Sequence, residues 1–451
     1  MFLTRDLVAR GVALSRRVLR GSPAVHSRRF LYFLSVTLLA LLLFAPACGE
    51  EEEEEAATTP EATTAAEPTE AAAEEVQGVT DTEILLGSHL PLSGNPAAAF
   101  SPIGDGISAY FDYINDVEGG VHGRKIKLLI EDDHYNPADA AEVVRKLVEQ
   151  DGVFAIISGL GEEPHGAVWK YLEERGIPDM FIASGAHKWT EPVVRTRFGG
   201  FPDYLVEGRM LGKYIVENYD GKKIGVLMED NELGDDGLAG VNMSLEGSEV
   251  QIIATEKCEA IQGDMTAQTQ RLRNANVEVV LVLAGPLQAA SVARTAREVL
   301  NWDVPILVTG VDCSDILIEL AGENAEGVIS VVFGHQVYET DLPGVQQHHE
   351  IMETYGHGVP ASNFTLYGAA IGELMVEALK NAGPDLTYDS LVEGAESIRN
   401  FQCSVCMTPV NMSPTDHRPY EIEVYNRVEN GKWVAFGEPV DFETTPPEER
   451  E

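Results

Sequence analysis

Small polar residues follow two neighbouring apolar runs of the chain. Ser-Gly-Leu-Gly at residues 158–161 comes after the apolar run at 154–157, and Ser-Gly-Ala-His at 184–187 comes after the run at 180–183. Serine hydroxyls and the open backbone amides of glycine-rich loops can hold a polar ligand where a strand ends. Ser-Gly is also ordinary turn chemistry, but two occurrences in succession make a binding site an equal alternative.

Motifs of the common catalytic sites are missing from the sequence. The chain has no His-Glu-x-x-His and no Gly-x-Ser-x-Gly, and the glycines and lysine of residues 208–213 are one residue short of a phosphate loop and fall in a predicted helix. The pair His348-His349 is expected on a solvated helix face. We therefore predict a binding protein that has no catalytic activity, no cofactor and no metal.

Two cysteines have the spacing of a metal-ligand pair. They are Cys403 and Cys406, and no second pair stands at the distance of a zinc ribbon. A local disulfide or free buried thiols are therefore favoured over zinc. With Cys258 and Cys313, the four cysteines after residue 48 allow three disulfide connectivities.

Strands and helices alternate through the first part of the chain. Strand-like runs lie at residues 82–88, 126–130, 154–157 and 180–183, with helical patterns between them. This order predicts a parallel sheet that is covered by helices on both faces and binds ligands outside the carboxyl ends of its strands.

A second alternating series begins after Gly-Gly-Phe-Pro at residues 199–202. Its strand ends carry further candidate ligand loops at residues 229–233, 284–286 and 309–312. Near the carboxyl terminus a hairpin with its turn at Asn430-Gly431 is predicted. The chain is thus predicted to hold two similar α/β lobes.

The amino terminus has the composition of an export signal. Residues 1–30 carry seven arginines and one acid, and residues 31–47 carry no charge. An uncleaved anchor is the alternative, because these 17 residues reach the lower limit for crossing a bilayer. Cys48 resembles the lipobox cysteine of bacterial lipoproteins, although Ala45 stands where that motif usually has leucine. The resemblance implies cleavage before Cys48 and acylation of its thiol.

Acidic residues dominate the exported part of the chain. Residues 49–80 contain eleven glutamates and too few large apolar side chains to fold, which predicts a disordered tether. Removal of residues 1–47 takes away seven arginines and one aspartate and leaves 25 basic against 72 acidic residues, a formal net charge of −47. This charge excludes nucleic acid as a partner.

Five phrases carry a resemblance to a known family. They are Leu-Pro-Leu-Ser-Gly at residues 90–94, Ile-Asn-Asp-Val-Glu-Gly-Gly-Val-His-Gly-Arg-Lys at 114–125, Asp-Asp-His-Tyr-Asn-Pro at 132–137, Ala-Ser-Gly-Ala at 183–186 and Thr-Gly-Val-Asp at 309–312. In order and spacing they resemble the extracellular solute-binding proteins of branched-chain-amino-acid-type ABC importers, the leucine/isoleucine/valine-binding protein family.

The resemblance implies an α/β fold of two Rossmann-like parallel-sheet lobes joined by a three-segment hinge, the type I periplasmic binding fold. The expected segments are a signal peptide at residues 1–47, a lipid-anchored acidic tether at 48–80, lobe I at 81–200 plus 336–405, lobe II at 201–335 plus 406–441, and a tail at 442–451.

The resemblance also implies a ligand site between the lobes. In the family, backbone amides and hydroxyl groups of lobe I hold the ligand's carboxylate, and an acid of lobe II receives its ammonium. Position by position, Glu162 and His187 fall where the family has hydroxyls, and Asp312 falls where it has the acid. Glu162 would repel a carboxylate by roughly a few kcal/mol in a dry site, so a protonated His187 or another cation is expected. The predicted ligand-binding residues are Ser158, Gly159, Leu160, Glu162, Ser184, Gly185, Ala186, His187, Leu233, Gly285 and Asp312.

These features predict an extracytoplasmic solute-binding protein of an ABC importer that closes two lobes around an amino acid or a related small polar solute. Its expected partners are the solute, a permease and ATPase complex, and the membrane through the lipid at Cys48. We expect a monomer on the outer face of the cytoplasmic membrane, in the periplasm or at the cell surface. Two alternatives stay open: a ligand-sensing lipoprotein of the same fold, and a binder of amide, urea-type or cationic solutes.

Overall fold

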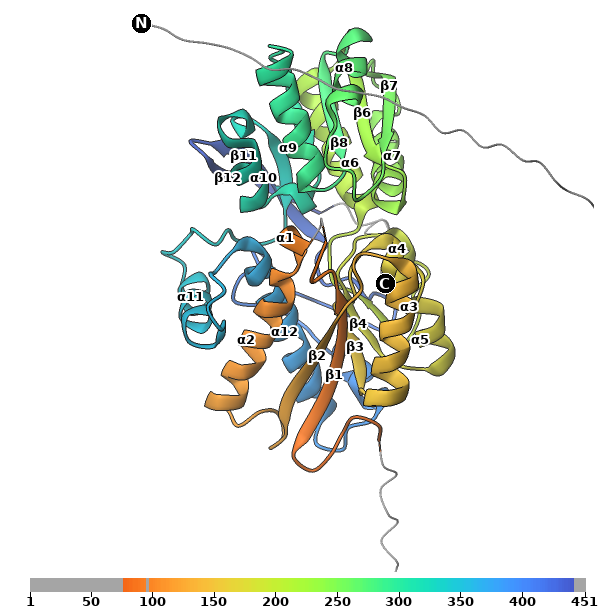
Figure 1. Cartoon of the computed structure of the whole chain (residues 1–451), viewed down its shortest axis with the longest axis vertical. Helices are drawn as coiled ribbons and strands as arrows, with labels where there is room; N and C mark the ends of the chain where they lie inside the picture. The colour runs from red at the N-terminus through yellow and green to blue at the C-terminus, as the bar shows by residue number, and fades with distance from the viewer. Residues whose placement is uncertain (1–75, 95–96, 442–451) are drawn as a thin grey trace, which may run out of the picture. The chain divides into compact units, whose positions relative to one another are not determined.

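The computed structural model describes residues 76–94 and 97–441 (Figure 1). The predicted signal peptide, the acylated Cys48, nearly all of the tether and the tail lie outside the described residues. The described residues belong to one compact unit. Within the described part, no helix combines the length and the apolar character that crossing a membrane requires.

The first sheet has five parallel strands in the order β2-β1-β3-β4-β5. They are β1 (Glu83–Leu90), β2 (Lys125–Asp132), β3 (Ala155–Ile157), β4 (Asp179–Ile182) and β5 (Arg197–Gly199). β3 and β4 are buried along their whole length, as is usual for central strands of a sheet covered on both faces. Because β3 and β4 pair in parallel, the loops that follow them leave the sheet at the same edge.

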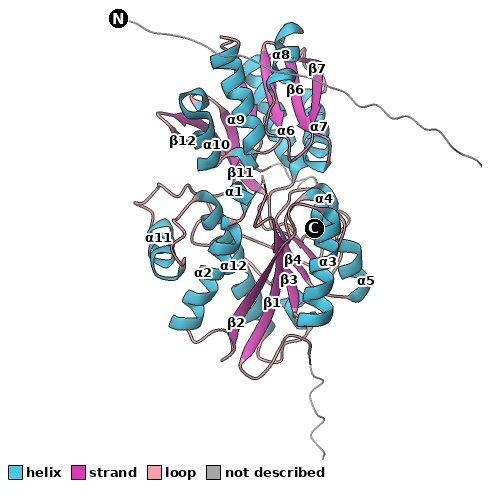
Figure 2. Cartoon of the chain, viewed as in Figure 1, coloured by secondary structure: helices cyan, strands magenta, loops and turns pink. Residues whose placement is uncertain are grey.

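Helices pack on both faces of this sheet (Figure 2). Ala155 and Ile157 of β3 belong to a core with α2 and α12, whereas Ile156 belongs to a second core with α3 and α5. The helical segments of this lobe are α1 (Ala97–Phe100), α2 (Pro102–Val117), α3 (Pro137–Lys146), η1 (Leu147–Asp151), α4 (Glu162–Gly166), α5 (Trp169–Arg175), η2 (His187–Trp189), α11 (Pro343–Tyr355), α12 (Asn363–Ala382) and α13 (Tyr388–Glu396).

The ends of these helices follow from the sequence. α12 begins with a capping box in which Ser362 and Thr365 each accept a hydrogen bond from the other's backbone amide. α3 begins after Asn136, whose side chain accepts from two amides of the first turn.

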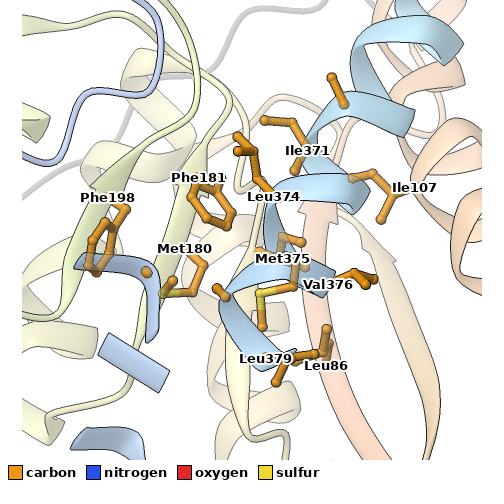
Figure 3. Close-up of a cluster of buried hydrophobic side chains, with 14 of the residues drawn as sticks. Leu86, Ile107, Met180, Phe181, Phe198, Ile371, Leu374, Met375, Val376 and Leu379 are labelled. Atoms are coloured by element: carbon orange, nitrogen blue, oxygen red, sulfur yellow. The ribbon is translucent and has the colours of Figure 1, made fainter. Parts of the chain in front are cut away.

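The larger core of the lobe lies between β1, β4, α2 and α12. Figure 3 draws part of it: Leu86, Ile107, Met180, Phe181, Phe198, Ile371, Leu374, Met375, Val376 and Leu379.

The second sheet has seven strands in the order β12-β11-β10-β9-β8-β6-β7. They are β6 (Lys223–Glu229), β7 (Gln251–Cys258), β8 (Val279–Leu283), β9 (Ile306–Val308), β10 (Ile329–Val332), β11 (Ile422–Glu429) and β12 (Lys432–Asp441). β6 to β10 are parallel, and β11 and β12 form an antiparallel hairpin. The predicted turn of this hairpin is confirmed, since Asn430 and Gly431 have φ values of 54° and 71°.

Helices α6 and α7 lie against each other at close range. A Cβ atom on Gly240 of α7 would stand 2.0 Å from the carbonyl oxygen of Leu205 on α6, so only glycine permits this approach. The helical segments of this lobe are α6 (Tyr204–Tyr219), α7 (Glu232–Leu245), α8 (Thr266–Asn274), α9 (Pro286–Arg294), η3 (Thr295–Val299), η4 (Gly310–Asp312), α10 (Asp315–Ala321) and η5 (Gly322–Ala325).

The chain passes between the two sheets three times: after β5, after β10, and between α13 and β11. The third passage contains a disulfide between Cys403 and Cys406, while Cys258 and Cys313 are free buried thiols. The pair with metal-ligand spacing therefore forms the local disulfide that was favoured over zinc. The predicted α/β fold of two lobes is confirmed.

Candidate functional site

A partly open cavity lies between the two lobes, with a volume of about 120 Å³. Lobe I contributes the end of α1 and the loops after β3 and β4, and lobe II contributes the loops after β6, β8 and β9. All of these loops stand at the carboxyl ends of parallel strands, where open α/β sheets bind their ligands. The cavity is therefore the candidate ligand site.

Aromatic side chains from separate segments form one wall of the cavity. Phe201 follows the first passage between the lobes, and its ring centroid lies 5.8 Å from those of Phe333 and Tyr367, which it meets edge to face. The Tyr204 ring lies 6.2 Å from that of Phe201. These rings offer a largely apolar surface to the body of a ligand.

Glu162 is the acid of lobe I in this cavity, and three hydroxyl groups donate hydrogen bonds to it. Tyr135 donates to Oε2 over 3.1 Å, and Ser184 and Tyr204 donate to Oε1 over 2.9 and 2.8 Å. Burial raises the pKa of Glu162, Glu163 raises it further, and the hydrogen bonds of Tyr204 and Ser184 oppose the rise. Glu162 is thus a buried acid that already accepts from neutral donors.

Glu229 is the acid of lobe II in the same cavity, and it stands at the end of β6. The backbone amide of Gly285 donates to Oε1 over 3.1 Å, and the Asn231 side chain donates to Oε2 over 2.9 Å. Burial raises the pKa of Glu229 to about 8, and the nearby Glu162 contributes to the rise. The two acids therefore influence each other across the cavity.

Polar contacts join the lobes beside the cavity. Asn231 also donates to Glu163 of α4 over 3.1 Å, and the backbone amide of His187 donates to Asp236 over 2.9 Å. Lys188 pairs with Glu232 of α7. These three contacts lie partly in solvent and cost little to break, whereas the buried hydrogen bond from Tyr204 of α6 to Glu162 also joins the lobes.

Four of the residues predicted to bind the ligand line the cavity: Leu160, Glu162, Leu233 and Gly285. Ser184 stands behind the wall, where its hydroxyl donates to Glu162 and accepts from the indole of Trp189 over 2.8 Å. The roles predicted for these residues toward a ligand stay predictions.

The other predicted residues of lobe I are not among those that line the cavity. Gly185 is packed against the first passage, where a Cβ atom would lie 2.0 Å from the carbonyl oxygen of Pro202. Ala186 packs with Trp189, and His187 bonds Asp203 through Nδ1 over 2.7 Å. This bond raises the pKa of His187, in the direction expected from the sequence, but the imidazole faces Asp203 and not the cavity.

Asp312 of lobe II is fully buried and also stands behind the wall, between the lining residues Val311 and Cys313. One oxygen accepts from the Thr309 hydroxyl over 3.3 Å, and the other has no partner. Burial, followed by Glu229 and Glu207, raises its pKa well above the ordinary range. Its predicted contact with a ligand ammonium stays a prediction.

Ser158 and Gly159 lie over a buried chain of four titratable groups. His89 bonds Asp133 over 2.8 Å and His165 over 3.0 Å, and His165 bonds Asp179 over 2.9 Å. The central contact needs a proton on one of the two facing nitrogens, since two lone pairs at this distance would repel each other. Burial lowers the pKa of His89, and the hydrogen bond to Asp133 opposes that shift. A Cβ atom on Gly159 would lie 2.5 Å from His165. Only glycine therefore lets the loop pass this close to the four titratable groups.

The sequence analysis did not predict three parts of the site, namely Tyr135, Glu229 and the aromatic wall. The loop at residues 229–233 was predicted to meet a ligand, but Leu233 was chosen from it. The signal for Glu229 was an acid at the very end of a strand of apolar residues. Nothing local marks Tyr135, which reaches Glu162 from 27 residues away.

The free thiol of Cys313 also lines the cavity, but it is no nucleophile. Burial raises its pKa well above the ordinary range, and a reactive thiol requires a lowered pKa. Among the described residues no group of three or more His, Cys, Asp or Glu side chains could hold a metal ion.

The family model described as periplasmic binding protein matches residues 83–422. The chain belongs to the periplasmic binding protein family. Among curated relatives, the leucine-, isoleucine-, valine-, threonine- and alanine-binding protein of Pseudomonas aeruginosa is 24% identical over 48% of this chain and 57% of its own length. The Leu/Ile/Val-binding protein homolog 1 of Brucella abortus is 24% identical over 69% of this chain and 82% of its own length.

Solved structures share the fold. A branched-chain amino acid ABC transporter protein from Thermus thermophilus with bound valine has a TM-score of 0.72 at 20% identity, over 80% of this chain and 97% of that one. A solute-binding protein from R. palustris in complex with benzoate has a TM-score of 0.68 at 20% identity, over 80% and 98%. The chain therefore has the fold of these solute-binding proteins.

Proposed function

We propose that the protein is the receptor of an ABC importer, held outside the cytoplasmic membrane, which closes its lobes around a small solute and delivers it to a permease. The observation that carries the proposal is the cavity of about 120 Å³ between two lobes that the chain links three times. An apolar wall with a few convergent polar groups is the usual composition of a small-molecule site. The relatives that bind amino acids support the same assignment.

The ligand is a compact molecule with a mostly apolar body and a polar head. An engineered cavity of about 150 Å³ in another protein accepts benzene, which sets the scale for the body. The aromatic wall around Phe201 receives the body, and Glu162 and Glu229 receive hydrogen-bond donors of the head. The relatives that bind amino acids make a free amino acid the first solute to test.

The lobes are expected to open without ligand and to close on it. Small-angle scattering of residues 76–451 should give a smaller radius of gyration when the ligand is saturating, because closure brings the lobes together. A thermal-shift screen can first find the ligand, since a compound at 100 times its dissociation constant stabilises the folded state by about 2.7 kcal/mol. Identical scattering curves with and without a ligand of demonstrated affinity would contradict closure.

The anchor is a separate expectation. We propose that the mature protein begins at an acylated Cys48, so mass spectrometry of the membrane-extracted protein should find a lipid-modified Cys48 as the first residue. The variant Cys48→Ser should leave the membrane fraction, because a cysteine thiol is the acylated group. If the membrane-bound protein retains residues 1–47, this segment is an uncleaved anchor and the expectation is wrong.

A further inference from the structure

We infer that the cavity selects compact organic cations that lack a carboxylate, such as primary amines, over amino acids and organic acids. The inference rests on the proposed receptor function and names the class of ligand. It starts from two independent observations, namely a partly open cavity with an aromatic wall and two buried acids that line it without a lysine or arginine partner. Lysine and arginine are absent from the described residues that line the cavity.

The donors around Glu229 are arranged for an ionised carboxylate. Gly285 offers a backbone amide and Asn231 a side-chain amide, and each faces a different oxygen of Glu229. The Asn231 amide has a fixed orientation, because its oxygen accepts from the amide of Leu233 over 3.1 Å. Both neighbours can only donate, so they favour a charged Glu229. The environment therefore supplies hydrogen bonds for an anion but no counter-charge.

The hydroxyl groups around Glu162 of lobe I also donate hydrogen bonds without supplying a positive charge. Burial and the charge of Glu162 raise the pKa of Tyr135 and of Tyr204 well above the ordinary range, so both hydroxyls keep their protons and donate. A carboxylate has about four acceptor positions. The hydrogen bonds from Asn231 and Gly285 leave room on Glu229, whereas three hydroxyls and a backbone amide already donate to Glu162. An ammonium group brings three donors and a positive charge to the remaining positions of Glu229.

A ligand carboxylate would be repelled by the acids of this site once they are ionised, which for Glu229 is above about pH 8. The titratable groups around the two acids are Tyr135, Glu163 of α4, Tyr204 and Glu207 of α6, Cys258 of β7, Asp312 and Cys313 at η4, and His335. Five of the groups in and around the cavity are carboxyls, and His335 already contacts Glu339 over 3.4 Å. The aromatic wall adds attraction for a cation, so charge and shape select the same class.

Matched compounds test the inference by calorimetry. Isobutylamine, isovaleramide and isovalerate share one isobutyl body, valine is isobutylamine with an added carboxylate, and benzylamine, benzamide and benzoate form a second series. Each amine is expected to bind at least tenfold more tightly than its matched acid, and isobutylamine at least tenfold more tightly than valine. An acid, an amide or valine that binds more tightly than the matched amine would overturn the inference.

The pH dependence gives a second readout. Glu229, with a pKa of about 8 in the empty site, holds a proton at lower pH and must release it to pair with an amine, which itself stays charged to about pH 10. Amine affinity should therefore rise by up to about tenfold for each pH unit from 6 to 8 and then level off. The binding heat should depend on the buffer because a proton is released. Amine binding that is independent of pH would contradict the inference.

Two variants test whether amine binding depends on the acid in the cavity or would respond to the loss of any buried acid. Glu229→Gln removes the charge but keeps the shape, so it should weaken amine binding at least tenfold at pH 8 and abolish the pH dependence. Glu423→Gln is the matched control, because Glu423 is a buried acid with a raised pKa that does not line the cavity, and it should leave amine affinity unchanged. Equal effects of both variants would overturn the inference.

The outcomes also distinguish this inference from the receptor function. If neither amine binds but a broader screen finds an uncharged or anionic solute that closes the lobes, the cation inference fails and the receptor function stands. If no solute binds or closes the lobes, both fail.

Discussion

Replacement of His165 by leucine is expected to lower the free energy of unfolding by about 3–5 kcal/mol. His165 and Asp179 are both buried, and the bond between them, together with the contact to His89, satisfies both ring nitrogens. Leucine would leave the Asp179 side chain without its hydrogen bond and would expose a nitrogen of His89 to an apolar neighbour. Removing one partner of a buried hydrogen-bonded pair is costly because the polar group left behind stays buried without a partner.

The control is an exposed histidine that also contacts an aspartate. His134 contacts Asp139 over 3.0 Å, but its side chain is 55% exposed. His134→Asn, which suits the left-handed backbone of this position (φ 53°), should therefore cost less than about 1 kcal/mol. Urea denaturation at neutral pH measures both variants, and similar costs for the two would show that the buried chain of four groups does not stabilise the fold.

Gly240→Ala is expected to destabilise the protein by about 3 kcal/mol and to weaken ligand binding. The new methyl group would lie 2.0 Å from the carbonyl oxygen of Leu205 and 2.8 Å from the amide of Arg209, so α6 must move away from α7. Leu205 follows Tyr204, which donates to Glu162 in the cavity. A shift of α6 therefore lengthens a hydrogen bond of the ligand site.

Gly237→Ala on the same helix is the matched control. Its methyl group would meet only the Leu283 side chain, at 3.2 Å, and leucine can adjust. Because alanine favours helix by about 1 kcal/mol over glycine, the expected stability change is within about 1 kcal/mol and ligand affinity should not change. If Gly240→Ala were as stable as Gly237→Ala in thermal unfolding, the close approach of the two helices would not matter.

Local patterns predicted most of the fold. β8 and β9 end directly before the loops predicted at residues 284–286 and 309–312, because a fully buried strand ends where its apolar residues end. Helix α13 was missed: it is short and follows a Gly-Pro pair, and its capping box of Thr387 and Ser390 was the available signal. The third passage between the lobes has little regular structure and could not be placed from periodicity.

The ligand site was predictable only in part. Loops at strand ends were expected to meet a ligand, and Leu160, Glu162, Leu233 and Gly285 do line the cavity. Which loop residue points inward depends on contacts made across the fold. His187 turns to Asp203, and the wall around Phe201 joins segments more than one hundred residues apart. No pattern within a single segment carries such information.

The disulfide in the third passage ties the shape of the cavity to the redox state of the surroundings. Val405, which lines the cavity, lies between Cys403 and Cys406. Disulfides persist in oxidising surroundings and are rare in the reducing cytosol. Under reducing conditions the chain therefore lacks one covalent constraint beside its cavity.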